Sequence, residues 1–180
     1  MQRRNFLIST ALATTVGQKA FSKTSNKDGF IVKKGKNRTG HPTPFMGVNP
    51  NDVKISSKDT DGQLSVFEYI GTQKIGPPLH MHYDQDETFY VIEGEYIFQL
   101  GDKKTKLTAG DTIYLPRNIP HTWIQTTDYG KLIYLLQPAG KMEEFFAEFS
   151  KVTGPPVMEE MAKLFHVHGV KLVGPPLSLD

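Results

Sequence analysis

The stretch from Phe45 to Pro138 constrains the fold most, because it is a series of short segments rich in Val, Ile, Tyr, Phe and Thr. Gly, Pro, Asn and Asp interrupt these segments every few residues, and no helical spacing of apolar residues fits them. The predicted strands are Val53–Ser57, Leu64–Ile70, Thr88–Glu93, Tyr96–Leu100, Lys104–Leu107, Thr112–Leu115, His121–Thr126 and Leu132–Leu136. Many short strands at close spacing indicate a β-sandwich or a β-barrel.

Beyond Pro138 the spacing of apolar residues changes from strand-like to helical. Two groups of four fall at positions i, i+3, i+4 and i+7: Met142, Phe145, Phe146 and Phe149, then Met158, Met161, Ala162 and Phe165. Pro155 and Pro156 separate the two predicted helices, and Gly169 suits the end of the second. Each apolar stripe is expected to pack on the β-structure or on a second subunit.

Residues 1–20 are predicted to be an export signal. A basic pair, Arg3 and Arg4, precedes an apolar run from Phe6 to Val16. That run is about half as long as a helix that crosses a bilayer, so no stable membrane insertion is expected after export. The string from Arg3 to Leu7 resembles a twin-arginine signal, which predicts a periplasmic or secreted bacterial protein. The alternative is a retained N-terminal anchor or a disordered arm.

Residues 21–42 are rich in Lys, Ser, Asn and Gly and are predicted to be a linker or N-terminal arm, in which Phe30–Lys33 could pair as an edge strand. The first twenty residues hold three of the 21 basic residues and no acid, so 18 basic and 19 acidic residues remain. No basic stripe is left to bind nucleic acid. The chain has no cysteine, which excludes disulfides, zinc–thiolate sites, iron–sulfur clusters and cysteine nucleophiles.

Four side chains have the types and spacing of metal ligands. His80 and His82 lie two residues apart, so on a strand both imidazoles point to the same face. Glu87 follows a short turn and starts the next strand, and His121 opens another strand further along the chain. Three imidazoles and one carboxylate would leave one or two coordination positions open on Fe, Mn, Ni, Co, Cu or Zn. The sequence therefore predicts one divalent transition metal.

This pattern resembles the two conserved motifs of the cupin superfamily. The first motif, His-x-His followed by Glu and Gly, matches His80, His82, Glu87 and Gly94, although its opening Gly is offset to Gly76. The second motif matches Gly110, Pro116 and His121. Asn118 replaces its inner Gly, and among substitutes for glycine asparagine is best able to accept a positive φ. Gln125 replaces the final Asn of the motif.

The resemblance covers roughly residues 40–140 and keeps all four ligand positions. It implies an all-β fold, a double-stranded β-helix or jelly-roll barrel, over residues 43–140. Residues 141–180 would form a C-terminal helical tail. Cupins are often dimers, so a homodimer is a further expectation, for which the Phe-rich helix could supply the interface.

Side-chain alternation on the predicted strands also gives a candidate substrate pocket. Some apolar residues share a face with Glu87 or His121, and a neighbouring strand adds others. The predicted pocket residues are Phe89, Val91, Tyr96, Phe98, Trp123 and Gln125. An aromatic, mostly apolar pocket suits a flat aromatic or phenolic substrate better than a polyhydroxylated sugar.

One barrel followed by helices and Gly174–Pro176 resembles bacterial proteins of the quercetin 2,3-dioxygenase type. The resemblance implies that O₂ and a flavonol-like small molecule are the substrates and that Fe, Mn, Ni, Co or Cu is the metal. In that family the carboxylate ligand accepts the proton of the flavonol hydroxyl, so Glu87 would be ligand and catalytic base together.

Two alternatives remain open at the level of sequence. The first is a non-redox isomerase or lyase that acts on a sugar or uronate, for which Zn would suffice. It needs polar pocket groups, and the candidates are Gln99, Gln125, Tyr90, Tyr134 and Arg117. The second alternative is a non-catalytic module that binds a small molecule.

Overall fold

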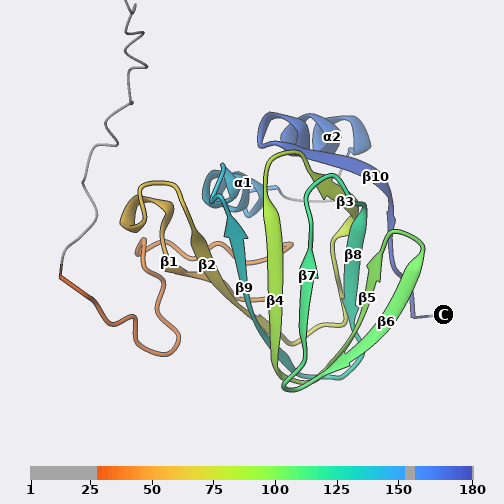
Figure 1. Ribbon diagram of the computed structural model, residues 1–180, viewed down its shortest axis with the longest axis horizontal. Helices are drawn as coiled ribbons and strands as arrows, with labels where there is room; N and C mark the ends of the chain where they lie inside the picture. The colour runs from red at the N-terminus through yellow and green to blue at the C-terminus, as the bar shows by residue number, and fades with distance from the viewer. Residues whose placement is uncertain (1–27, 153–156, 180) are drawn as a thin grey trace, which may run out of the picture.

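Ten strands form two five-stranded antiparallel sheets in the computed structural model, which describes residues 28–152 and 157–179. Figure 1 shows the sheets as the two walls of a barrel that is wide at one end and narrow at the other. The order of the first sheet is β1 (Asn51–Ile55), β2 (Ser65–Gly71), β9 (Gly130–Gln137), β4 (Asp86–Glu93) and β7 (Thr112–Leu115). The order of the second is β10 (Val170–Pro176), β3 (Pro78–His82), β8 (His121–Gln125), β5 (Glu95–Leu100) and β6 (Lys103–Thr108).

The predicted jelly-roll fold is confirmed, and the alternation of side chains explains why these segments pair. On β9, Leu132, Tyr134 and Leu136 are buried, whereas Ile133 and Leu135 between them face outward and are half-buried. Each inward-facing residue joins an aromatic-rich core between the sheets. Burial of one face in this way fixes the register of each strand, because a shift by one residue would turn the core residues outward.

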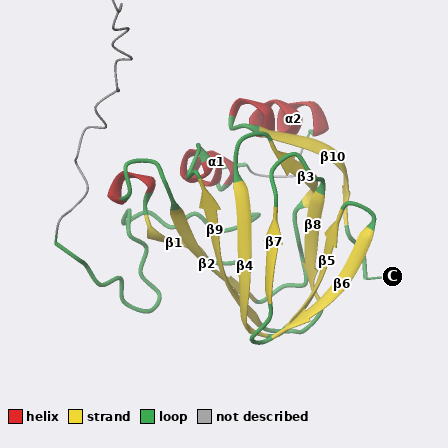
Figure 2. Cartoon of the chain, viewed as in Figure 1, coloured by secondary structure: helices red, strands yellow, loops and turns green. Residues whose placement is uncertain are grey.

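Two helices cover the wide end of the barrel and are called the cap here. They are α1 (Met142–Phe149) and α2 (Met158–Val167), drawn in red at the top of Figure 2. The buried residues of the cap are Met142, Phe145, Phe146, Phe149, Met161 and Phe165. The Phe-rich stripe therefore packs on the barrel, the first of the two expected uses, and it offers no outward surface to a second subunit.

Residues 170–176 differ from the helical tail expected for this region, because they form strand β10. This strand pairs antiparallel with β3, and Val170 and Leu172 lie opposite His82 and His80. Gly174, Pro175 and Pro176 had the composition of a loop, since proline cannot donate to a strand ladder. A strand at the edge of a sheet tolerates proline, and β10 is an edge strand.

The described part of the N-terminal arm, residues 28–42, contains no strand, so the edge strand considered for Phe30–Lys33 is wrong. Arg38 instead fixes the arm to the barrel. Its backbone N–H donates to the Val53 carbonyl at 2.7 Å, and its guanidinium binds Asp59 of the short helix η1 (Ser57–Asp59). The predicted export signal lies outside the described residues. None of the helices that the structure describes is long and apolar enough to span a membrane.

Candidate metal centre

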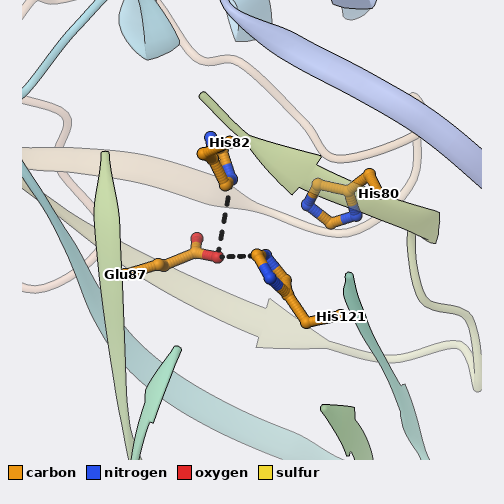
Figure 3. Close-up of side chains that lie close together, drawn as sticks. All are labelled: His80, His82, Glu87 and His121. Carbon is orange, nitrogen blue, oxygen red and sulfur yellow. Dashed lines mark ion pairs between the residues drawn. The ribbon is translucent and has the colours of Figure 1, made fainter. Parts of the chain in front are cut away.

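Three strands bring the four predicted ligands together, and Figure 3 shows that their side chains lie close to one another. His80 and His82 come from β3, His121 begins β8, and Glu87 is the second residue of β4 in the opposite sheet. His80 and His121 are directly paired across neighbouring strands. All four side chains are buried, and one ligating atom from each lies within 4.8 Å of the others.

The carboxylate of Glu87 lies between two of the imidazoles. Its Oε2 atom is 3.3 Å from Nε2 of His121 and 3.7 Å from Nε2 of His82. The ring of His80 completes the cluster, with its centroid 4.6 Å from that of His121. Nitrogen and oxygen atoms at these separations could all reach one ion at roughly 2.0–2.2 Å after small rotations of the side chains.

Backbone carbonyls set the orientation of two of the imidazoles. Nδ1 of His80 lies 2.8 Å from the Pro78 carbonyl oxygen, and Nδ1 of His121 lies 2.9 Å from that of Ile119. A carbonyl oxygen can only accept, so each Nδ1 carries a proton, and in the neutral imidazole this leaves the Nε2 lone pair free for a metal. This arrangement is usual for metal-bound histidines, whose other ring nitrogen donates to an oriented acceptor.

The donor set fits a divalent metal ion. Among the described residues, the buried Nε2 atoms of His82 and His121 make no hydrogen bond. Buried polar atoms without partners are costly, and a shared cation would satisfy them together with the Glu87 carboxylate. Burial and the charge of neighbouring imidazoles keep the pKa of His80 well below its usual value. Burial, with the charge of His121, lowers the pKa of His82 to about 3. Both imidazoles are therefore neutral near pH 7, which is the form that binds metals.

A small cavity lies between the ligand cluster and the cap. Its volume of about 40 Å³ holds only a few water molecules, since each requires roughly 10–15 Å³ on the same measure. The residues around it are Phe45, Tyr69, Pro77, Pro78, His80, His82, Glu87, Phe89, Trp123, Tyr134, Met142, Phe145, Phe146, Phe149, Phe165 and Val170. Apart from the ligands, the polar groups on these side chains are two phenolic hydroxyls and the indole N–H.

Both hydroxyls of the cavity wall are held by asparagines. Tyr134 donates to Oδ1 of Asn51 at 2.7 Å, and the hydroxyl of Tyr69 accepts from Nδ2 of Asn49 at 2.6 Å. Burial raises the pKa of Tyr69, and burial followed by the charge of Glu87 raises that of Tyr134. Both phenols therefore stay neutral at physiological pH and leave the wall uncharged.

Two of the six predicted pocket residues, Phe89 and Trp123, line this cavity. The other four, Val91, Tyr96, Phe98 and Gln125, face inward as expected but do not line it. Gln125 lies four residues beyond His121 along β8, and its amide donates to the carbonyls of Gly71 and Thr127. Alternation predicts the side of a strand to which a residue points, but it does not predict how far along the barrel the residue lies.

The cap supplies cavity residues that sequence reasoning had not placed there. Phe145, Phe146 and Phe149 of α1 and Phe165 of α2 line the cavity beside the ligands, and the ring centroid of Phe165 is 6.3 Å from that of His80. Their helical spacing was visible in the sequence, but only the fold shows that this stripe covers the metal ligands. Of the polar residues considered for a sugar site, Tyr134 alone lines the cavity. Gln99 donates a hydrogen bond to the Gly101 carbonyl, and Tyr90 is exposed. Arg117 forms an ion pair with Asp86.

Comparisons with known proteins agree with this geometry. The family described as "Cupin domain" matches residues 67–136. The quercetin 2,3-dioxygenase of Bacillus subtilis is 32% identical over 102 residues, which are 57% of this chain and 30% of that protein. An uncharacterized protein of Methanocaldococcus jannaschii is 42% identical over 95 residues, 53% of this chain and 62% of that protein. The matches thus span 30% and 62% of the lengths of these relatives.

Two solved structures share the fold. KdgF from a Halomonas species superposes with a TM-score of 0.50 at 17% identity, over 57% of this chain and 90% of its own. An RmlC-like cupin from Shewanella frigidimarina has a TM-score of 0.50 at 21% identity, over 57% of this chain and 87% of its own. At these identities the likeness concerns the fold alone.

Proposed function

Since this chain belongs to the cupin superfamily, we propose that it is a metal-dependent dioxygenase acting on a flavonol-like or phenolic small molecule. The observation that carries this proposal is the chemistry of the cavity wall. Beside the ligands, the wall is made of phenylalanines and other apolar side chains, and it holds no charged group from the described part of the chain except Glu87. A flat aromatic ring fits such a wall, whereas the many hydroxyls of a sugar would lose their hydrogen bonds to water without replacement.

His80, His82, Glu87 and His121 would hold the metal. A divalent Fe, Mn, Ni, Co or Cu ion would supply Lewis acidity and redox chemistry toward O₂ at this position. The match to the Bacillus subtilis quercetin 2,3-dioxygenase supports this chemistry, although it covers 30% of that protein. The activity is therefore proposed for this chain from its own site.

Glu87 is the residue we assign to proton transfer. Its carboxylate is buried beside the cavity and is the acidic group in the wall, so a phenolic hydroxyl bound there would lie within its reach. The rings of Phe89, Trp123 and Tyr134 would hold the substrate by stacking and edge contacts. Together with the cap, these rings would also exclude bulk water from the reacting atoms.

The cavity is too small for the proposed substrate unless the cap moves. A volume of about 40 Å³ cannot contain a flavonol, and the cap is the part of the wall made of helices rather than sheet. A flavonol-like substrate therefore has to displace side chains of Phe145, Phe149 or Phe165 when it binds. The proposed enzyme would close over its substrate, which suits a reaction that must be shielded from water.

Oxygen consumption with quercetin tests the proposal. The protein is loaded separately with Fe, Mn, Ni, Co, Cu and Zn, metal content is measured, and O₂ uptake is followed with an electrode. We expect uptake with at least one redox-active ion and none with Zn. Glu87→Gln should lower turnover more than metal occupancy, whereas Glu93→Gln, an exposed position on the same strand, should change neither.

Four results would redirect the assignment. Absence of O₂ uptake from every metal-loaded form would contradict the dioxygenase. Turnover of an unsaturated uronate without O₂ would favour the non-redox isomerase or lyase. Binding of a phenolic ligand to fully metallated protein without turnover would favour the non-catalytic binding module. Full turnover by Glu87→Gln at full metal occupancy would exclude Glu87 as the base.

A further inference from the structure

The loop of residues 116–120, between β7 and β8, contacts the segments that carry the metal ligands. It leads directly into His121, and its Ile119 carbonyl accepts the hydrogen bond from Nδ1 of that histidine. The backbone N–H of Asn118 donates to the carbonyl of His82 at 2.8 Å. The side chain of Asn118 donates to the carbonyl of Tyr83, the residue after His82. The loop thus joins the end of β3 to the start of β8.

Arg117 extends this contact to the strand of the fourth ligand. Its backbone N–H and its Nε both donate to Oδ1 of Asp86, at 2.9 and 3.0 Å, and its Nη2 donates to Oδ2 at 2.8 Å. Asp86 is the residue before Glu87 at the start of β4. Three hydrogen bonds from one residue therefore fix the backbone from which the Glu87 carboxylate projects.

We propose that Arg117 is a positioning residue of the metal centre, acting through Asp86 on Glu87. This inference rests on the proposed metal-dependent function. Alternation along β4 turns Asp86 away from the cavity and Glu87 into it, so Arg117 reaches Glu87 only through the shared backbone. The planar guanidinium fixes both carboxylate oxygens of Asp86 at once, which a single-point contact cannot do.

Stability alone does not account for this arrangement. The side chains of Arg117 and Asp86 are 43% and 25% exposed, and pairs this accessible to water contribute little to the free energy of unfolding. The geometry is nevertheless highly constrained, and the loop backbone adopts a left-handed conformation at Asn118, with φ of 63°. Placement of ligands explains both features, because metal sites need donor atoms held in a fixed geometry.

The chain contains a matched control for the experiment. Arg38 binds Asp59 with the same two-point geometry, at 3.0 and 2.7 Å, and its side chain is 32% exposed. That pair joins the N-terminal arm to η1 and contacts none of the segments that carry the ligands. Asp59 is only 8% exposed and Arg38 also lies over the Phe30 ring, so removal of Arg38 should cost at least as much stability as removal of Arg117. Only Arg117 lies next to the metal centre.

The test compares full-length wild type, Arg117→Gln, Arg117→Lys and Arg38→Gln. Measurements are the dissociation constant for Co²⁺, the visible absorption spectrum of the Co²⁺-loaded protein, and the thermal unfolding midpoint. We expect Arg117→Gln to bind Co²⁺ about tenfold more weakly and to change the spectrum. Its unfolding midpoint without metal should fall no further than that of Arg38→Gln. Arg117→Lys keeps the charge but loses the two-point contact, so its affinity should lie between wild type and Arg117→Gln.

The outcomes separate this inference from the proposed function. If wild type binds no Co²⁺ or other divalent transition metal, the metal centre itself is wrong and the inference is overturned with it. If wild type binds Co²⁺ and Arg117→Gln matches Arg38→Gln in affinity and spectrum, the metal centre stands and the positioning role is overturned.

Discussion

The orientation of the metal-binding histidines depends on main-chain atoms. His80 and His121 each donate from Nδ1 to the carbonyl two residues earlier, Pro78 and Ile119. Both acceptors lie two residues before the histidine, so the ring orientation follows from the backbone conformation of the preceding residues. Substitutions that change this backbone conformation should therefore disturb metal binding even though they remove no ligand.

His82→Ala is predicted to abolish stable metal binding, since the three remaining ligands would hold a labile ion weakly. Affinity should fall by at least about tenfold, the effect typical of losing a residue that merely orients a ligand. Elemental analysis after dialysis measures the metal content. His41→Ala is the control, because His41 is exposed and lies outside the cluster. Equal metal content in the two variants would contradict the ligand assignment.

Glu68 is predicted to stabilise the fold through charge pairing on the outer side of the first sheet. Burial opposes ionisation of Glu68, but Lys131 at 2.7 Å and Lys54 at 3.1 Å outweigh this effect and lower its pKa below the usual 4.5. A carboxylate with a lowered pKa in the folded state stabilises the fold above its unfolded pKa. That contribution is lost as pH falls through the folded value.

Glu68→Gln should therefore reduce the free energy of unfolding by about 1–3 kcal/mol at neutral pH. The difference from wild type should shrink as the pH falls through the lowered pKa of Glu68. Urea titrations from about pH 7 to about pH 3 measure this difference. Glu159→Gln, which removes an exposed pair with Lys163 on α2, should change stability by less than about 1 kcal/mol at any pH. A difference for Glu68→Gln that does not vary with pH would contradict the charge-pairing explanation.

At the scale of secondary-structure elements, helix α1 combines an apolar face toward the cavity with a polar attachment at its start. Glu143, in its first turn, accepts hydrogen bonds from the Ser56 hydroxyl at 2.7 Å and from the backbone N–H of Ser57. Ser56 caps η1 and Ser57 begins it, so these bonds attach α1 to the connection between β1 and β2. This attachment holds one end of the cap over the cavity.

Glu143→Gln should loosen α1, because hydrogen bonds to a charged carboxylate are worth about 1.5–3 kcal/mol. Backbone amides of α1 should exchange with solvent roughly tenfold to a hundredfold faster, as measured by hydrogen–deuterium exchange. Glu144→Gln is the matched control, since it removes the same charge from the same helical turn at an exposed position. Equal exchange rates in the two variants would show that Glu143 does not hold the cap.

Sequence patterns predict most of the strands, both helices and all four candidate metal ligands. The eight predicted strands correspond to β1, β2, β4, β5, β6, β7, β8 and β9, because their alternation is local to each segment. The positive φ expected at Asn118 is also confirmed. Strand β3 (Pro78–His82) is missing from the predicted strands, although the interpretation of His80 and His82 assumed an extended segment there. Strand β10 and the cavity residues of the cap were also missed, because both depend on distant partners. The pairing of Leu172 with His80 and the position of Phe165 beside His80 arise only when the barrel closes.

At the scale of the whole molecule, export remains a prediction that the described residues do not address. If Arg3 and Arg4 form a twin-arginine signal, the protein would fold and take up its metal before it crosses the membrane. A fusion of the N-terminal segment to a reporter should reach the bacterial periplasm. The double substitution Arg3→Lys and Arg4→Lys should retain the reporter in the cytoplasm. Equal export of both fusions would contradict the twin-arginine route.

The pairing of β10 with β3 has a consequence for the order in which the protein matures. The strand that carries His80 and His82 is flanked by residues 170–176, which lie about fifty residues beyond His121, the last of the four ligands in the sequence. During translation all four ligands leave the ribosome long before this neighbouring strand does. A nascent chain would therefore present its histidines on an unsupported edge, and tight capture of the ion would await the synthesis and pairing of residues 170–176.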